Sequence, residues 1–138
     1  MRITTKGRYA IRAIVNMAAS NENKPISIKS ISNSEELSPI FLEQIFTKLK
    51  KAGITESVRG ASGGFKLAKE LDQITVLDVL EAVEEGVVLA PCTAGEGNCD
   101  RSVDCGLANF WYETEQGIRD QLQNKTVQSI MDQYISQG

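Results

Sequence analysis

Residues 37–69 read LSPIFLEQIFTKLKKAGITESVRGASGGFKLAK, and this stretch decides the fold. Ser38 followed by Pro39 is typical of a helix start, because serine caps the first turn and proline needs no amide partner there. The apolar residues that follow recur at helical spacing: Leu42, Ile45, Phe46 and Leu49. Gly53 stands where a helix commonly ends in a left-handed residue. The pattern predicts an amphipathic helix between Pro39 and Gly53.

Two short strands are predicted directly after this helix, ITESV (54–58) and GFKLA (64–68), separated by the glycine-rich turn RGASG (59–63). Upstream, Ser27 is expected to cap a short helix over roughly residues 28–34 that turns Ile28 and Ile31 inward. Two helices joined by a tight turn and followed by a hairpin indicate a winged helix-turn-helix.

The remaining segments are also helical in pattern. A helix capped by Thr4 or Thr5 is predicted to bury one face, made of Ile11, Ile14, Val15 and Ala18. Thr75 and Asp78 form a capping-box pattern before a helix with an apolar face of Val76, Leu80 and Val83. Thr126 is expected to cap the last helix, which bears Val127, Ile130, Met131 and Tyr134.

One further helix has a near-heptad apolar stripe: Leu107, Trp111, Thr114, Ile118 and Leu122. Leaving such large side chains in water costs about 1.5–3 kcal/mol each, so we expect a homodimer through residues 106–123. The predicted fold is mainly α with a small β wing. Its expected divisions are a winged helix-turn-helix at 1–85, a cysteine-bearing loop at 86–105, and a dimerisation helix with a C-terminal helix at 106–138.

The charge is divided unevenly along the chain. The net charge is −3, but residues 1–66 carry eleven Lys and Arg against five Asp and Glu, whereas residues 67–138 carry four against thirteen. A basic first half favours a polyanion-binding surface. The chain contains no apolar run near the ~18 residues of a membrane span, and MRITTKGRYA (1–10) does not look like a signal peptide. We therefore expect a cytoplasmic protein with no membrane partner.

A winged helix of this kind predicts contacts with a double-stranded DNA operator. Gln44 can pair with adenine, and Glu43 can accept a hydrogen bond from cytosine N4. Ile40 also lies on the outward side of this helix. Phosphate contacts are expected from basic residues of this helix and the N-terminus: Lys48, Lys51, Arg2 and Lys6, with Lys50 and Arg8 beside them. Arg59 on the wing can enter a narrow minor groove. A protein-docking winged helix with a solvated lysine face is the alternative.

All three cysteines lie in CTAGEGNCDRSVDC, at Cys92, Cys99 and Cys105, in a chain without histidine. In a reducing compartment, clustered cysteines favour metal or redox chemistry over a structural disulfide. Iron–sulfur clusters are held by cysteine thiolates, usually four. Spacings of six and five residues suit a structural zinc site poorly, and a reversible thiol switch is a further alternative. An iron–sulfur cluster, [2Fe-2S] or [4Fe-4S], is the leading interpretation.

Three segments carry a resemblance: MRITTKGRYAIRAI (1–14), the stretch 37–69, and ITVLDVLEAVEE (74–85) before the cysteines. They are similar to the IscR-like iron–sulfur cluster regulators, within a family of small dimeric winged-helix transcription regulators. The resemblance implies a homodimer whose DNA binding depends on its cluster. It places Ser38, Glu43 and Gln44 on the recognition helix and Arg59 on the wing. Ile40 stands where these regulators have a serine.

The resemblance leaves the fourth cluster ligand open. These regulators use a histidine three residues after the last cysteine, where this chain has Ala108. A nitric-oxide-sensing branch uses an aspartate near the N-terminus of the partner subunit, where this chain has Arg8. The loop carboxylates Asp100, Asp104 and Glu96 are weak candidates.

The expected function is transcription regulation in response to a cluster that senses iron, oxygen, nitric oxide or redox state. The alternative is a winged-helix regulator switched by thiol oxidation, a metabolite or a protein partner. Enzymatic activity is not expected, because the chain has no histidine for general base work and no phosphate-binding loop.

Overall fold

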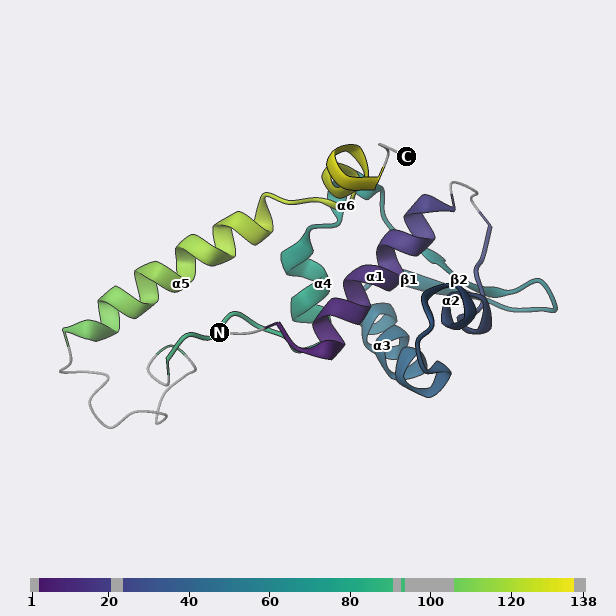
Figure 1. Cartoon of the computed structure of the whole chain (residues 1–138), viewed down its shortest axis with the longest axis horizontal. Helices are drawn as coiled ribbons and strands as arrows, with labels where there is room; N and C mark the ends of the chain where they lie inside the picture. The colour runs from purple at the N-terminus through teal and green to yellow at the C-terminus, as the bar shows by residue number, and fades with distance from the viewer. Residues whose placement is uncertain (1–2, 21–23, 91–92, 94–105, 136–138) are drawn as a thin grey trace.

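The computed structural model describes residues 3–20, 24–90, 93 and 106–135. Its elements follow in chain order: α1 (Thr5–Ala19), α2 (Ile28–Glu35), α3 (Pro39–Lys51), β1 (Thr55–Val58), β2 (Gly64–Leu67), η1 (Leu71–Gln73), α4 (Val76–Ala82), α5 (Leu107–Gln123), α6 (Val127–Ile130) and η3 (Met131–Ile135). Helices α1–α4 and the hairpin form one body, and α5 extends away from it (Figure 1). The predicted fold class, mainly α with a small β wing, is confirmed.

The helix-turn-helix forms where the sequence predicts it. Ser27 Oγ accepts a hydrogen bond from the Ser30 N–H at 3.0 Å, and this caps α2. Ser38 Oγ accepts one from the Phe41 N–H at 3.4 Å, with Pro39 in the first turn of α3. Gly53 has φ +79° and ends that helix.

The wing is a two-stranded antiparallel sheet, in which Thr55 lies opposite Leu67 and Val58 opposite Gly64. Ile26 extends this sheet on the side of β2, because it exchanges two backbone hydrogen bonds of 2.8 Å with Phe65. A Cβ at Gly64, where φ is +152°, would lie 2.4 Å from the Ile26 carbonyl oxygen. The hairpin is therefore fastened to the residues just before α2.

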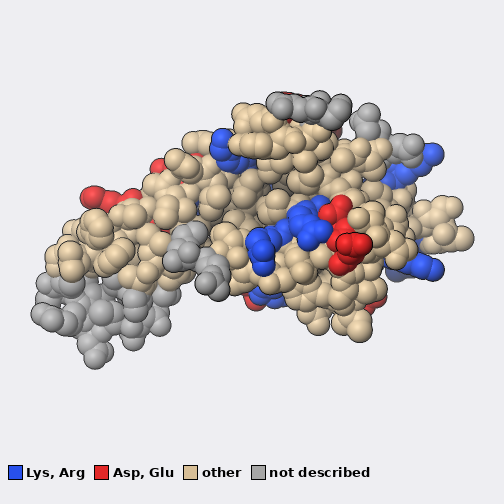
Figure 2. Space-filling model, in the orientation of Figure 1, with Lys and Arg blue, Asp and Glu red and all other residues tan. Residues whose placement is uncertain are grey.

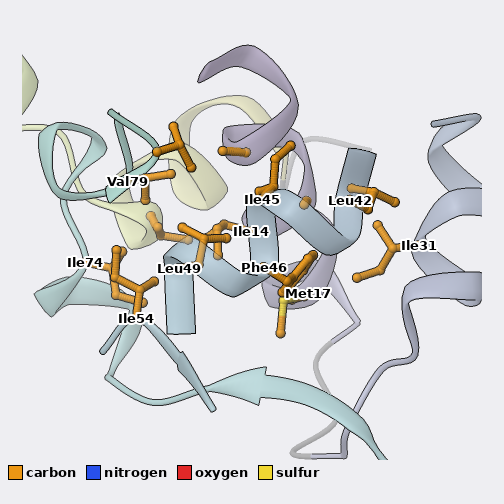
Figure 3. Packing of buried hydrophobic residues seen from close by; sticks show 14 of the residues in the cluster. Ile14, Met17, Ile31, Leu42, Ile45, Phe46, Leu49, Ile54, Ile74 and Val79 are labelled. Carbon is orange, nitrogen blue, oxygen red and sulfur yellow. The ribbon is translucent and has the colours of Figure 1, made fainter. Parts of the chain in front are cut away.

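The core lies between α1, α3 and α4 and receives side chains from every nearby element (Figure 3). All four predicted α3 residues are buried: Leu42, Ile45, Phe46 and Leu49. The face predicted for α1 needs correction, since its buried residues are Gly7, Ala10, Ala13, Ile14 and Met17, while Ile11, Val15 and Ala18 are half-buried. Gly7 lies close to the end of α4, because a Cβ there would be 2.8 Å from Glu85 Cγ and 3.0 Å from Leu80 Cδ2.

The capping box of α4 is present, with Thr75 and Asp78 exchanging hydrogen bonds. The predicted face of α4 is too narrow, because Leu77 and Val79 are buried with Leu80 and Val83, whereas Val76 is half-buried. At the C-terminal end, the Glu84 N–H donates to the Glu81 carbonyl at 3.0 Å and the Glu85 N–H to the Leu80 carbonyl at 2.7 Å. Glu84 has φ +64°, so a left-handed residue ends this helix.

Helix α5 packs principally on α4, and the chain then returns to the body through a backbone bridge. The Val76 N–H donates to the Lys125 carbonyl at 2.8 Å, and the Val127 N–H donates to the Ile74 carbonyl at 2.9 Å. Val127 is buried in the common core, so the last helix packs on the winged-helix body. Tyr134, near the end of the chain, is 68% exposed. No described helix is both long and apolar enough to cross a membrane.

Candidate DNA-binding surface

One face of α3 is exposed because the opposite face supplies four buried side chains. The exposed residues include Ser38, Ile40, Glu43, Gln44 and Lys51, all predicted to face DNA. Ile40 is 70% exposed, so its apolar side chain lies in solvent. The structure therefore brings together the predicted base-reading residues near the N-terminal end of α3, where a helix in the major groove reaches base edges.

The wing places Arg59 at the base of its turn. Arg59 is exposed directly after β1 and before Gly60, which has φ +111°. The nearby cation Lys66 is paired across the strands with Glu56 at 3.2 Å. Arg2, predicted to contact phosphate, lies outside the described residues.

Lys48 differs from the other predicted contacts because an acidic partner occupies its ammonium. Lys48 Nζ lies 2.9 Å from Glu84 Oε2, and its side chain is 33% exposed. The hydrogen bond from Lys48 is the main cause that lowers the pKa of the Glu84 carboxyl, followed by the charges of Lys48, Lys6 and Lys51. Lys48 thus pairs with Glu84, and the charges of Lys6 and Lys51 also lower the pKa of that carboxyl; we call Lys6, Lys48 and Lys51 the lysine cluster.

Charge on the molecule is patchy (Figure 2). On the face drawn there, basic side chains gather over the winged-helix body beside acidic ones, and further acidic side chains lie along α5. One such mixed contact joins Arg12 of α1 to Glu35 of α2, with Arg12 Nη2 also donating to the Glu35 carbonyl at 2.7 Å. Basic residues of the body are therefore partly neutralised by neighbouring carboxylates.

The predicted cluster ligands Cys92, Cys99 and Cys105, with Asp100, Asp104 and Glu96, lie outside the described residues. Within 3–20, 24–90, 93 and 106–135, no three His, Cys, Asp or Glu side chains come together as a metal site. The donor set itself fits a cluster in part, because three thiolates are the ligand type that iron–sulfur clusters prefer. The fourth donor stays unassigned.

Sequence reasoning missed three features. It did not pair Glu84 with Lys48, which lie 36 residues apart. It did not include Phe110 and Tyr112 among the apolar residues that α5 exposes, and they are 52% and 55% exposed. It also overlooked a shallow hollow beside α2 lined by Ser27, Lys29, Ser30, Asn33 and Ser34. The serine-rich run SIKSISNS (27–34) was the available signal for the last of these.

Residues 3–133 match the Rrf2 family, described as an iron-dependent transcriptional regulator. The chain belongs to the Rrf2 family. The HTH-type transcriptional regulator IscR of Vibrio cholerae is 37% identical over 131 residues, which is 95% of this chain and 75% of that protein. The predicted IscR-like identity is therefore confirmed, and the chain is an Rrf2-family, IscR-like transcriptional regulator.

Two solved Rrf2-like structures share the fold at moderate identity. T. potens IscR is 31% identical with a TM-score of 0.77, and the match covers 100% of this chain and 92% of that one. CymR, the global cysteine regulator of B. subtilis, is 29% identical with a TM-score of 0.77, covering 96% of this chain and 97% of that one. An oxidized form of Staphylococcus aureus CymR also matches, with a TM-score of 0.71 at 29% identity.

Proposed function

We propose that this Rrf2 regulator binds a double-stranded DNA operator as a homodimer, through α3 and the wing, and that an iron–sulfur cluster held by Cys92, Cys99 and Cys105 controls the binding. The observation that carries the DNA-binding part is the exposed face of α3, with Glu43 and Gln44 near its N-terminal end and Arg59 on the adjacent hairpin. In this proposal residues 1–85 bind DNA, 86–105 hold the cluster, and 106–138 contain the dimerisation helix and C-terminal helix.

The contacts divide by chemistry. Gln44 offers a donor and an acceptor to adenine, and Glu43 accepts from a base amine, so both read sequence. The ammonium groups of Lys6 and Lys51 hold phosphates, which fix register without reading bases. Ile40, with its apolar side chain in solvent, suits contact with a thymine methyl group. Ser38 is exposed, and its hydroxyl hydrogen remains available while its oxygen caps α3.

Selection from a randomised duplex library tests this division. Wild type should enrich one symmetric sequence, and Glu43→Ala should enrich a broader set, because a carboxylate near DNA is repelled unless a base donor satisfies it. Glu113→Ala provides a control, since it removes a carboxylate from α5, outside the proposed DNA-binding surface. An unchanged selection profile for Glu43→Ala would remove this residue from base reading.

The cluster part of the proposal rests on the three thiols and on the IscR relatives. When bound, a cluster supplies an electron-transfer and ligand-exchange centre that responds to redox state or to small molecules. The chain contributes three thiolates within fourteen residues, between the end of α4 and the start of α5. Anaerobic reconstitution followed by Mössbauer spectroscopy would count the iron and assign the cluster type.

A thiol switch is the second candidate, because the matching CymR structures include one of an oxidized form. The two candidates respond differently to treatment. A cluster regulator changes its DNA affinity on reconstitution with iron and sulfide, whereas a thiol switch changes it on mild oxidation of the iron-free protein. Measuring operator affinity of both preparations, before and after a reductant, separates them.

A further inference from the structure

Glu84 contacts the proposed DNA-binding surface although it belongs to neither α3 nor the wing. Its carboxylate accepts a hydrogen bond from Lys48 Nζ at 2.9 Å, and Lys48 lies in the last turn of α3. The charges of Lys6 and Lys51 also reach Glu84. A residue of α3 therefore contacts this carboxylate, and the charges of two further lysines act on it.

Backbone hydrogen bonds fix the turn that carries Glu84. The left-handed φ of +64° at Glu84 turns the chain after α4, and two hydrogen bonds to the Glu81 and Leu80 carbonyls fix this turn. At the end of α3 the same backbone role is taken by Gly53. Glu84 thus adds a charged side chain at a position that a glycine could fill.

A carboxylate and a DNA phosphate are competing acceptors for one ammonium group. A lysine that is already paired releases no counterion from DNA unless its first partner leaves. The pKa of the Glu84 carboxyl is lowered from its usual acidic range, mainly by the hydrogen bond from Lys48, so this group is an anion at neutral pH and competes there for the ammonium. Protonation would free Lys48 only in acid, as the pH falls through the lowered pKa.

We propose that Glu84 is an internal competitor for phosphate that occupies Lys48 and restrains the affinity of the lysine cluster for DNA. This inference rests on the proposed function, because it assumes that the lysine cluster faces the DNA backbone. Its role is to set the balance between phosphate contacts and base contacts. With Lys48 occupied, a larger share of the affinity depends on base-reading residues such as Gln44.

The test is the salt dependence of binding to a mixed-sequence DNA duplex, which measures phosphate contacts alone. Glu84→Gln should steepen the plot of log affinity against log salt by about 0.9 for each DNA-bound protomer. Between 200 and 50 mM salt, this slope change raises the affinity ratio of variant to wild type by about 3.5-fold per protomer. Glu84→Gly is a second variant, because glycine adopts the left-handed turn without a side chain.

Glu81→Gln is the matched control. Glu81 lies on α4 and pairs with Arg119 of α5 at 3.0 Å, so its substitution makes the same change in net charge away from the lysine cluster. The double variant Lys48→Gln/Glu84→Gln should return to the wild-type slope, because the released ammonium is then absent.

The outcomes separate this inference from the proposed function. Steeper slopes for both Glu84 variants, without a change in Glu81→Gln, support the proposal that Glu84 competes with DNA phosphate for Lys48. Slopes equal to the control, or weaker binding by both Glu84 variants, overturn it while leaving DNA binding established. A wild-type protein that binds no duplex even at low salt would overturn the proposed function and this inference with it.

Discussion

At the scale of single residues, Gly64 is a position in the wing that leaves no space for a side chain. Gly64→Ala would force a Cβ within 2.4 Å of the Ile26 carbonyl oxygen at φ +152°. We expect a loss of about 1–3 kcal/mol in the free energy of unfolding. Urea denaturation measures this change.

Gly117→Ala is the control for that experiment. Gly117 lies within α5, and a Cβ there meets no atom within 4 Å. Alanine in a helix interior is favoured over glycine, so this variant should gain up to about 1 kcal/mol. A Gly64→Ala protein as stable as wild type would mean that the Ile26–Phe65 pairing is dispensable.

Arg59 is the residue on which the minor-groove assignment depends. Arg59→Ala should weaken operator binding by about 1–3 kcal/mol with the fold intact, because the side chain is exposed at the base of the turn. Lys51→Ala should instead lower affinity evenly across sequences and reduce the salt slope by about one. Fluorescence anisotropy with specific and mixed duplexes compares them; equal behaviour of the two variants would contradict the separate roles.

The sequence was informative at residues whose role is local. Ser27, Ser38 and Thr75 cap their helices as predicted, since a cap is decided within three or four residues. The Lys48–Glu84 pair joins segments 36 residues apart, and no local pattern indicates which lysine a distant carboxylate will meet. The cysteine assignments and the DNA contacts stay predictions.

At the scale of elements, α1 shows why a correct helix can be assigned the wrong face. Large apolar residues were expected to face the core, but the small residues Gly7, Ala10 and Ala13 are buried there. Small side chains let two helices approach, so burial there follows shape as well as hydrophobicity. The periodicity of Ile14 was still sufficient to predict the helix itself.

Helix α5 carries the prediction of a homodimer. Leu107, Phe110 and Trp111 are exposed in the single chain, whereas Ile118 and Leu122 farther along the stripe are half-buried. Trp111→Ala should weaken dimerisation by about tenfold or more, because burial of one large side chain contributes about 1.5–3 kcal/mol. Analytical ultracentrifugation measures the change.

Glu113→Ala is the control for this helix, since residue 113 lies on another side of α5 from Trp111. This variant should associate as wild type does. A wild-type protein that is monomeric at micromolar concentration would contradict the dimer, and an unaffected Trp111→Ala would move the interface elsewhere.

At the scale of the whole molecule, the three cysteines lie in the segment of sequence between the end of α4 and the start of α5. Replacing Cys92, Cys99 or Cys105 by alanine should abolish stable cluster loading, because only three thiolates are present. The core lies in other segments, so each variant should fold and dimerise. DNA binding should then stay fixed in the cluster-free state.

Operator affinity is the readout for this prediction. Wild type with and without cluster is compared with the three alanine variants. Near-identical affinity in all five samples would show that the thiols do not control DNA binding.

The backbone bridge between Thr75 and Thr126 ties the chain just after α5 to the start of α4. Helix α5 has 17 residues and is about 25 Å long. A displacement of about 2 Å at the Leu107 end, with the other end held, rotates a helix of this length by only about five degrees. The bridge adjoins the first turn of α4, and Glu84 follows the other end of that helix. Because the bridge joins the C-terminal end of α5 to this helix, a variant that weakens the bridge would test whether movement of α5 affects the lysine cluster.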